Sequence, residues 1–159
     1  MRKLKVYLET TMFNYYFDKD RDAHPDTVRF FEEIAAGGYD AYTSEHVINE
    51  LKRAPDEEKR NKMLDLIPKY GISVLKPDTD ARKLADAYVA EGVIPTDHLT
   101  DAMHIAISSV NDIDIILSLN FNHIVSKITE ERTGNINIRN GYRRVEIRPP
   151  MEVVKYERT

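Results

Sequence analysis

Residues 114–118 contain three consecutive aliphatic residues, Ile115, Ile116 and Leu117, with no polar residue between them. A strand exposed on one face alternates apolar and polar residues, whereas a strand covered on both faces carries a continuous apolar run. Strands of the second kind occur in parallel sheets, where connecting helices cover both faces. The segment therefore predicts an α/β fold built on a central, mostly parallel sheet.

Strand-like and helical segments alternate along the rest of the chain, as this fold requires. Further strands are predicted at residues 5–8, 40–43 and 71–75, with an edge strand at 145–147. Helices are predicted from Pro25, after the N-cap Ser44, from Pro55, and over the apolar stripes of 81–89 and 99–110. The expected architecture is a three-layer domain with helices on both faces of the sheet.

The length of 159 residues fits a single domain, with a core at about 4–148 and a short tail at 149–159. The absence of cysteine excludes disulfides, thiolate metal sites and a cysteine nucleophile. No apolar run approaches the ~18 residues that a membrane span needs, so we expect no membrane partner. The first residues lead directly into strand-like sequence without the apolar region of a signal peptide, so we expect a cytoplasmic protein.

The net charge of −4 bears on nucleic-acid binding. Proteins that hold nucleic acid through bulk electrostatics are basic, so this chain would need local basic patches or bound cations. Two basic clusters are candidates: Lys52 and Arg53 with Lys59, Arg60 and Lys62, and Arg143 and Arg144 with Arg139 and Arg148. Each cluster either contacts phosphates or is a solvated surface, and the solvated surface is the simpler interpretation of the first.

Four polar residues stand where such a fold forms its site, at the carboxyl ends of the strands. Glu9 follows the first strand directly, and Asn120 follows the central apolar strand. Glu50 lies on the helix after the second strand. Asp101 lies near the start of its helix, on a face that also carries Ile105 and that is opposite the main apolar stripe. We therefore expect that helix to be buried on both sides, with a carboxylate near its start.

Clustered carboxylates predict a bound cation. Two carboxylates about 5 Å apart at an effective dielectric constant of ~20 repel each other by roughly 3 kcal/mol. Such a cluster takes up protons or a cation, and hard oxygen ligands suit Mg²⁺ or Mn²⁺. An ion of this kind can activate water and stabilise charge on a phosphoryl oxygen.

Four segments resemble the PIN domain, in the order in which that family has them. The most specific is Asp101-Ala102-Met103-His104-Ile105-Ala106, and the others are residues 7–11, 44–50 and 116–124. The similarity covers about residues 4–148. It implies a Rossmann-like parallel sheet and a metal-dependent ribonuclease with an RNA substrate. Many relatives are VapC-type toxins, so the resemblance also implies an antitoxin partner and a homodimer.

The resemblance implies that Glu9, Glu50 and Asp101 bind the metal ion and that Asn120 completes the catalytic site. Two positions depart from the family pattern, because Glu9 replaces an Asp and the neutral Asn120 replaces an acid. An amide oxygen can still accept a water or contact a metal, but it adds no charge. Three carboxylates offset the charge of one divalent ion well and that of two ions much less well. We therefore expect a site for one ion, with activity that is weak or lost.

Several neighbours of these residues have two interpretations. Asp97 is either an auxiliary acid or, as we favour, a helix N-cap after Pro95. Thr10 and Ser118 are candidates for hydrogen bonds to the metal-binding carboxylates. His104 is expected to be a buried, hydrogen-bonded histidine rather than a general base. His123 lies either near the mouth of the pocket or on the surface, and the aromatic residues 15–17 belong to the core or to an interface.

Three functions follow from these features. The first is a metal-dependent endoribonuclease, a candidate for the toxin of a toxin–antitoxin pair. The second is a PIN fold that no longer cuts and binds RNA or a protein partner, which the altered positions Glu9 and Asn120 favour. The third, a small-molecule-binding α/β domain, is disfavoured because no glycine-rich phosphate loop follows the first strand.

Overall fold

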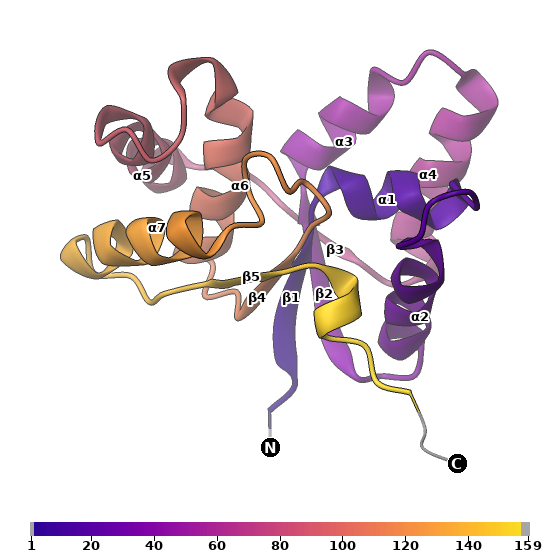
Figure 1. Cartoon of the computed structure of the whole chain (residues 1–159). Coiled ribbons are helices and arrows are strands. Elements are labelled where there is room, and N and C mark those ends of the chain that lie inside the picture. Colours follow the sequence, from indigo (N-terminus) through magenta and orange to yellow (C-terminus); the bar gives the residue numbers. More distant parts are fainter. Residues whose placement is uncertain (1, 157–159) are drawn as a thin grey trace.

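The computed structural model describes residues 2–156 and contains a five-stranded sheet in which all neighbouring strands run parallel. The strands are β1 (Leu4–Leu8), β2 (Tyr39–Ser44), β3 (Ser73–Leu75), β4 (Ile115–Leu117) and β5 (Glu146–Arg148). Their spatial order is β3-β2-β1-β4-β5. Figure 1 shows helices on both sides of this sheet, so the predicted three-layer α/β fold is confirmed.

The apolar run in β4 has the environment that its sequence predicts. β4 lies between β1 and β5, and the side chains of Ile116 and Leu117 are fully buried. In β1, which is the central strand, Val6, Tyr7 and Leu8 are also fully buried. The last strand, β5, lies at the edge of the sheet as predicted. Because side chains cover both faces of these strands, solvent reaches the sheet's polar groups mainly at the strand ends.

Seven α-helices surround the sheet within the described residues. They are α1 (Thr10–Phe17), α2 (His24–Ala35), α3 (Glu45–Lys52), α4 (Glu57–Lys69), α5 (Thr79–Ala90), α6 (Leu99–Val110) and α7 (Lys127–Arg139). In Figure 1, α5, α6 and α7 lie on one side of the sheet, and α1, α2 and α4 on the other. Helix α3 contacts both α1 and α6, so it joins the two layers at the end of the sheet where the candidate site lies.

Two of these helices are absent from the sequence-based prediction. Helix α1 has only eight residues, too few for a clear apolar periodicity. Helix α7 buries Thr133, Gly134 and Asn137 in place of a regular aliphatic stripe. Hydroxyl, amide and glycine residues have low helix propensity, and tertiary contacts stabilise this helix instead. One such contact is made by Arg144, which crosses Gly134 so closely that a Cβ there would lie 2.5 Å from its Nη1 atom and would displace the side chain.

The aromatic residues after the first motif belong to the core. Tyr15, Tyr16 and Phe17 are partly buried and pack against the main hydrophobic cluster. The ring of Tyr16 meets Phe31 edge to face at 5.0 Å, and its hydroxyl lies 2.7 Å from that of Tyr70. The core interpretation is therefore confirmed. Among residues 2–156, no helix combines the length and the apolar character needed to cross a membrane.

Burial of β4 leads to a stability prediction. We expect Ile116→Ala to lower the free energy of unfolding by about 2–5 kcal/mol, because the fully buried side chain leaves a cavity between the helical layers. Val74→Ala, in the edge strand β3, should cost less than about 1 kcal/mol because Val74 is 38% exposed. Urea unfolding of both variants measures the difference. Equal losses of unfolding free energy in the two variants would show that burial of β4 contributes no more to stability than the edge strand β3 does.

Candidate active site

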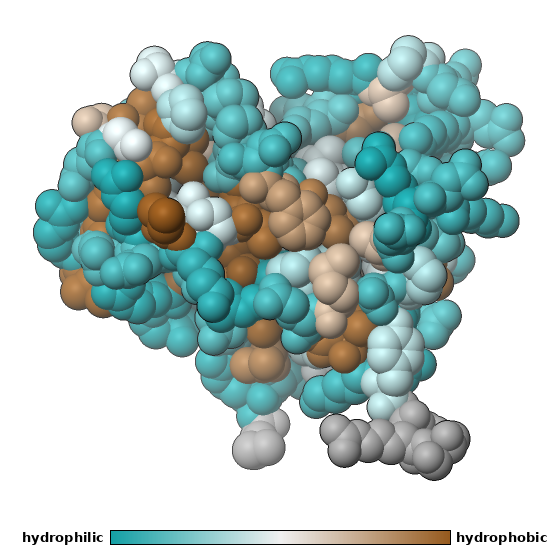
Figure 2. All heavy atoms as spheres, viewed as in Figure 1, coloured by the Kyte–Doolittle hydropathy of each residue, from teal (hydrophilic) through white to brown (hydrophobic). Residues whose placement is uncertain are grey.

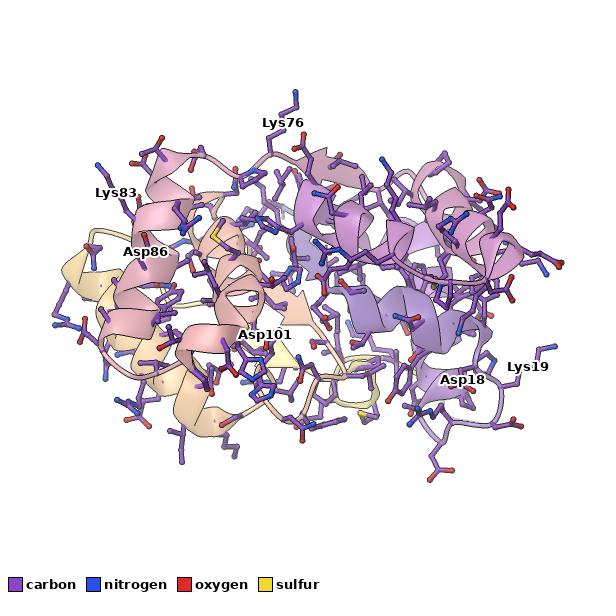
Figure 3. The ribbon with its side chains drawn as sticks, turned by 90° about the horizontal axis from the view of Figure 1, so that it is seen from above. Asp18, Lys19, Lys76, Lys83, Asp86 and Asp101 are labelled. Carbon is purple, nitrogen blue, oxygen red and sulfur yellow. The ribbon has the colours of Figure 1, made fainter. Side chains whose placement is uncertain are left out.

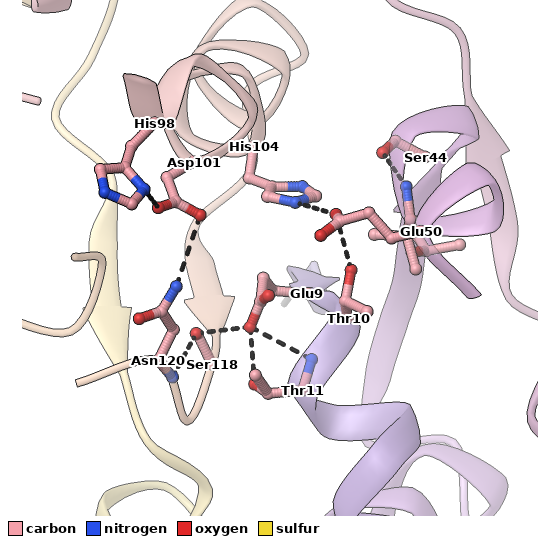
Figure 4. A network of polar contacts seen from close by, with 12 residues as sticks. Glu9, Thr10, Thr11, Ser44, Glu50, His98, Asp101, His104, Ser118 and Asn120 are labelled. Atoms are coloured by element: carbon pink, nitrogen blue, oxygen red, sulfur yellow. Dashed lines mark hydrogen bonds and ion pairs between the residues drawn. The ribbon is translucent and has the colours of Figure 1, made fainter. Parts of the chain in front are cut away.

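The carboxyl ends of β1, β2 and β4 bring the four predicted site residues into one region. Glu9 directly follows β1, and Asn120 follows β4 after the two-residue link Ser118-Leu119. Glu50 is on α3, which begins where β2 ends, and Asp101 is in the first turn of α6. In the view along the strands, Asp101 lies toward the middle of the molecule (Figure 3). Figure 4 shows all four side chains around a common space.

Glu9 is held in place through one of its two carboxylate oxygens. It is the N-cap of α1, and its Oε1 accepts hydrogen bonds from Thr11 N, Thr11 Oγ1 and Ser118 Oγ at 3.3, 2.6 and 2.7 Å. The residue is only 3% exposed, and burial raises the pKa of its carboxyl group. The predicted bond from Ser118 is present. Within the described residues, Oε2 accepts no hydrogen bond.

Glu50 is held in the same way. Its Oε1 accepts hydrogen bonds from Thr10 Oγ1 at 2.8 Å and from His104 Nε2 at 2.7 Å, and the predicted contact from Thr10 is therefore present. Its Oε2 atom also has no hydrogen-bond donor among residues 2–156. No fully buried side-chain oxygen or nitrogen in that part of the chain lacks a partner. The Oε2 atoms of Glu9 and Glu50 therefore both reach open space, which leaves them available as ligands.

His104 is fully buried and hydrogen-bonded, as predicted. Burial alone would lower its pKa, but the hydrogen bond to Glu50 and the charges of Glu9, Glu50 and Asp101 raise it. Burial likewise opposes ionisation of Glu50, yet the bond and charge of His104 bring the pKa of that carboxyl below its ordinary value. Both shifts favour the charged forms of the two groups, an imidazolium beside a carboxylate.

His104 is also the first member of a chain of hydrogen bonds that leads away from the site. His104 Nδ1 forms a hydrogen bond with Tyr7 Oη at 2.6 Å, and Tyr7 Oη forms another with Ser44 Oγ at 2.7 Å. In its protonated form His104 is the donor in the first of these bonds. Ser44 is the N-cap of α3, as predicted, and accepts from Val47 N at 3.3 Å. This chain of bonds connects β1, β2 and α6, and it fixes the position of Glu50.

Asp101 lies at the partly open side of the cluster, with 15% of its side chain exposed. Ile105 and Ser108 on the same face of α6 are fully buried, which confirms that the helix is covered on both sides. Asp101 Oδ1 is 3.4 Å from Asn120 Nδ2, and Oδ2 is 3.6 Å from His98 Nδ1. Burial raises the pKa of this carboxyl, and the neighbouring His104, His123 and His98 offset only part of the shift.

Asn120 is orientated differently from the sequence-based expectation. Its Oδ1 accepts a hydrogen bond from the backbone N–H of His123 at 3.2 Å. The amide nitrogen, not the oxygen, therefore faces Asp101. Asn120 is thus a donor to the carboxylate cluster, which we define as Glu9, Glu50 and Asp101.

A second group of ligand atoms lies beside this cluster. The rings of His98 and His123, which we call the histidine pair, stack with centroids 3.8 Å apart and planes inclined by 27°. Together with Asp101, they are the only three His, Asp or Glu side chains in residues 2–156 whose ligand atoms all lie within 4.8 Å of one another. The three carboxylates of the cluster are more widely spaced than this.

Asp97 is not the N-cap of α6. That position is occupied by His98, whose side chain makes no capping hydrogen bond, and Asp97 lies in the preceding 3-10 turn (Thr96–His98). Its side chain is 84% exposed and lies 3.6 Å from His98 Nε2. The turn breaks the helix before α6, so the N-cap preference of Asp has no effect there. Asp97 contacts the histidine pair rather than the carboxylate cluster.

The second basic cluster is divided: Arg143 and Arg144 lie away from the candidate site, whereas Arg148 ends β5 and pairs with Glu130. Arg143 pairs at 3.6 Å with Asp112 and with Asp114, the residue before β4, so it lies at the end opposite the candidate site. Arg144 crosses Gly134 and donates to Asn135 Oδ1 at 2.6 Å. The structure therefore does not bring these two arginines to the site.

The first basic cluster lies near Glu50. Lys52 ends α3, and Arg53 lines a recess of about 490 Å³ whose wall includes Asn14, Glu50 and Lys59. Neither Lys52 nor Arg53 forms an ion pair within the described residues. These side chains are therefore free to meet an anion.

Comparison with known proteins identifies the fold. The model of the PIN domain matches residues 6–127, more than half of the chain, and the chain belongs to the PIN-domain family. A chain in the crystal structure of VapBC2 from Rickettsia felis, bound to a DNA fragment from its promoter, superposes with a TM-score of 0.60 at 13% identity. The match covers 92% of this chain and 98% of that one.

A second solved structure has the same fold. VapC20 from Mycobacterium tuberculosis, described as a toxin that cleaves the sarcin-ricin loop, superposes with a TM-score of 0.56 at 14% identity. The match covers 89% of this chain and 98% of that one. No curated protein sequence matches the chain significantly. Both solved structures therefore share the fold of this chain.

Several residues of the site are absent from the sequence-based prediction. Thr11 binds Glu9, Tyr7 and Ser44 support His104, and His98 approaches Asp101. Thr11 and Tyr7 lie in the segment 7–11, close to the predicted site residue Glu9. Their place in this segment is the one sequence signal that points to them. The pairing of His98 with His123 joins residues distant in sequence and has no local pattern.

The His104–Glu50 pair predicts a pH dependence of stability without metal. The folded pKa of His104 is raised above its ordinary value of 6.5, so its stabilisation is complete below pH 6.5. This contribution is lost as pH rises through the folded pKa. We expect the metal-free melting temperature to fall from pH 6.5 upward, and Glu50→Gln to flatten that fall by removing the partner charge. Thermal unfolding in EDTA tests both, and an equally steep profile in the variant would rule out the ion pair.

Proposed function

We propose that this protein is an endoribonuclease that depends on Mg²⁺ or Mn²⁺. One observation carries the proposal: Glu9 and Glu50 are both fixed through Oε1, whereas both Oε2 atoms are available beside Asp101 in a PIN fold. Hydrogen bonds that hold a ligand by its other oxygen are typical of the second shell of metal sites.

The donor set fits a hard divalent ion. The candidate ligands are carboxylate oxygens, which Mg²⁺ and Mn²⁺ prefer. Three carboxylates and one imidazolium leave two negative charges, which a single divalent ion balances. When bound, the ion would activate water and stabilise charge on the phosphoryl group.

The surrounding side chains have positioning roles in this proposal. Ser118 and Thr11 orientate Glu9, while Thr10 and His104 orientate Glu50. Asn120 donates to Asp101 and directs that carboxylate. Because His104 is fully buried and both of its ring nitrogens are engaged, it holds its proton on Glu50 and does not act as a general base.

The direct test is cleavage of an unstructured RNA by the purified chain. We expect cleavage with Mn²⁺ or Mg²⁺ and none in EDTA, with calorimetry showing one ion per chain. The competing function is a PIN fold that binds RNA or a protein without cutting, and the neutral Asn120 favours it. RNA binding with no cleavage at any concentration of either ion would establish that function instead.

The variant Asp101→Asn tests whether Asp101 is a metal ligand or an acid that stabilises the fold. Because burial raises the pKa of Asp101, its ionised form lowers the stability of the fold above the ordinary pKa of 3.8. We expect the variant to lose metal binding and cleavage. In EDTA its unfolding free energy should remain level or rise by about 1 kcal/mol. Chemical unfolding in EDTA measures this, since bound metal would itself stabilise the wild type. A less stable metal-free variant would identify Asp101 as a structural acid.

We further propose that Arg53 and Lys59 contact RNA phosphates beside Glu50. Arg53→Ala should raise KM for RNA several-fold and weaken its salt dependence, because one phosphate contact is lost. Arg143→Ala, at the opposite end of the sheet, is the matched control and should leave KM unchanged. Steady-state cleavage at two salt concentrations tests the pair. A larger effect from Arg143 would place RNA on the other basic cluster.

An antitoxin partner is part of this proposal. The Rickettsia felis structure is of VapBC2 bound to a DNA fragment from its promoter, and one of its chains has the fold of this chain. In this chain, Phe121 and Ile128 are 56% and 69% exposed on the segment that follows Asn120. Figure 2 shows apolar patches among the hydrophilic side chains of one face. Exposed apolar side chains favour a protein partner near the site. The homodimer remains a prediction of the family resemblance.

A further inference from the structure

The histidine pair and Asp101 bring three ligand atoms together from separate parts of the chain. His98 ends the 3-10 turn before α6, and His123 lies in the loop between β4 and α7. The two imidazole rings stack at 3.8 Å, and His98 Nδ1 is 3.6 Å from Asp101 Oδ2. All three ligand atoms lie within 4.8 Å of one another, and each side chain is partly exposed. An ion from solvent can therefore reach them.

This donor set differs in kind from the carboxylate cluster. Imidazole nitrogens favour Zn²⁺, Ni²⁺ or Cu²⁺, whereas Mg²⁺ favours carboxylates and water. Zinc binds nitrogen at about 2.0–2.1 Å and carboxylate oxygen at about 2.0–2.2 Å. Because the two rings are stacked, binding requires the ligand atoms to move closer and the rings to turn until both nitrogen lone pairs point at one ion. A turn and a loop can make this adjustment more easily than the body of a helix. Two histidines and one carboxylate also leave a fourth position for water.

The surroundings of the histidine pair support its use as a ligand set. Asp97 Oδ1 lies 3.6 Å from His98 Nε2, the nitrogen that does not face Asp101. A carboxylate behind a histidine orientates the ring and increases its basicity toward a metal. His123 is positioned from the other side, because Asn120 Oδ1 accepts the hydrogen bond of its backbone N–H. Asp97 thereby gains a role that the nuclease proposal does not give it, and Asn120 gains a second role.

We propose that His98, Asp101 and His123 form a binding site for Zn²⁺ that is separate from the Mg²⁺ or Mn²⁺ site and shares one ligand with it. Zn²⁺ bound there engages Asp101 and places a second divalent charge beside the carboxylate cluster. The two ions therefore compete, and Zn²⁺ is an inhibitor of the nuclease. The competition rests on the proposed function, whereas Zn²⁺ binding by the histidine pair does not.

Calorimetric titration of Zn²⁺ into the EDTA-treated, dialysed protein tests the site. The wild type should bind one Zn²⁺, and the double variant His98→Ala/His123→Ala should bind it at least tenfold more weakly. His24→Gln, which changes a histidine at the start of α2, is the matched control and should behave as the wild type. Glu50→Gln should keep Zn²⁺ binding and lose Mn²⁺ binding, while Asp101→Asn should weaken both.

Competition has its own readout, which needs no catalysis. Electron paramagnetic resonance measures free Mn²⁺, and one equivalent of Zn²⁺ should weaken Mn²⁺ binding to the wild type at least tenfold. Zn²⁺ should have no such effect in the double variant. By linkage, Mn²⁺ weakens Zn²⁺ binding by the same factor. For inhibition, the cleavage rate with Zn²⁺ is divided by the rate without Zn²⁺ for each variant, and these ratios are compared.

Each outcome decides one part of the proposal. Zn²⁺ binding unchanged by the double variant, or absent from the wild type, would leave the histidine pair as a stacking contact only. Zn²⁺ binding without any effect on Mn²⁺ would overturn the competition alone. If the wild type binds Zn²⁺ but not Mn²⁺, the proposed nuclease fails while the Zn²⁺ site stands. Should the double variant misfold, NMR of the wild type decides, because Zn²⁺ should shift the ring signals of His98 and His123 and not those of His24.

Discussion

Repulsion among Glu9, Glu50 and Asp101 is the constraint on which the arrangement of this site depends. The fold offsets part of it with the buried His104, whose pKa is raised by its bond to Glu50 and by the three carboxylates. More of the repulsion is offset by hydrogen bonds that hydroxyl and amide groups donate to the carboxylates. The donors are Thr10, Thr11, Ser118 and Asn120. A cluster of carboxylates whose repulsion is only partly offset favours the uptake of a cation.

The parallel sheet explains why these groups meet. Its central strands are covered on both faces, so polar side chains can gather only where strands end. Glu9, Ser44 and Ser118 each stand at such an end, and α6 adds Asp101 and His104 from one layer while α3 adds Glu50 from the junction. The Tyr7 hydroxyl passes between the strands to join His104 to Ser44. Hydrogen bonds therefore connect the buried core directly to the site.

Patterns within one element were predictable, and contacts between elements were not. The run at Ile115–Leu117 and the two-sided burial of α6 follow from side-chain period, which the sequence displays directly. Helix α7 was missed because contacts such as Asn137 with Ser109 stabilise it rather than an apolar stripe. The orientation of Asn120 depends on the backbone N–H of His123, and the stacking of His98 depends on a distant loop. No local pattern encodes either contact.

Asn120 shows how one substitution connects the two proposed ion sites. A carboxylate at this position would repel Asp101 and add a fourth negative charge. The amide instead donates to Asp101 from Nδ2 and, through Oδ1, holds the segment that carries His123. The residue that reduces the charge of the carboxylate cluster thus also places a nitrogen ligand next to Asp101. Loss of the acid lowers the demand for a second hard cation, and the histidine pair provides neutral ligands that suit a softer ion.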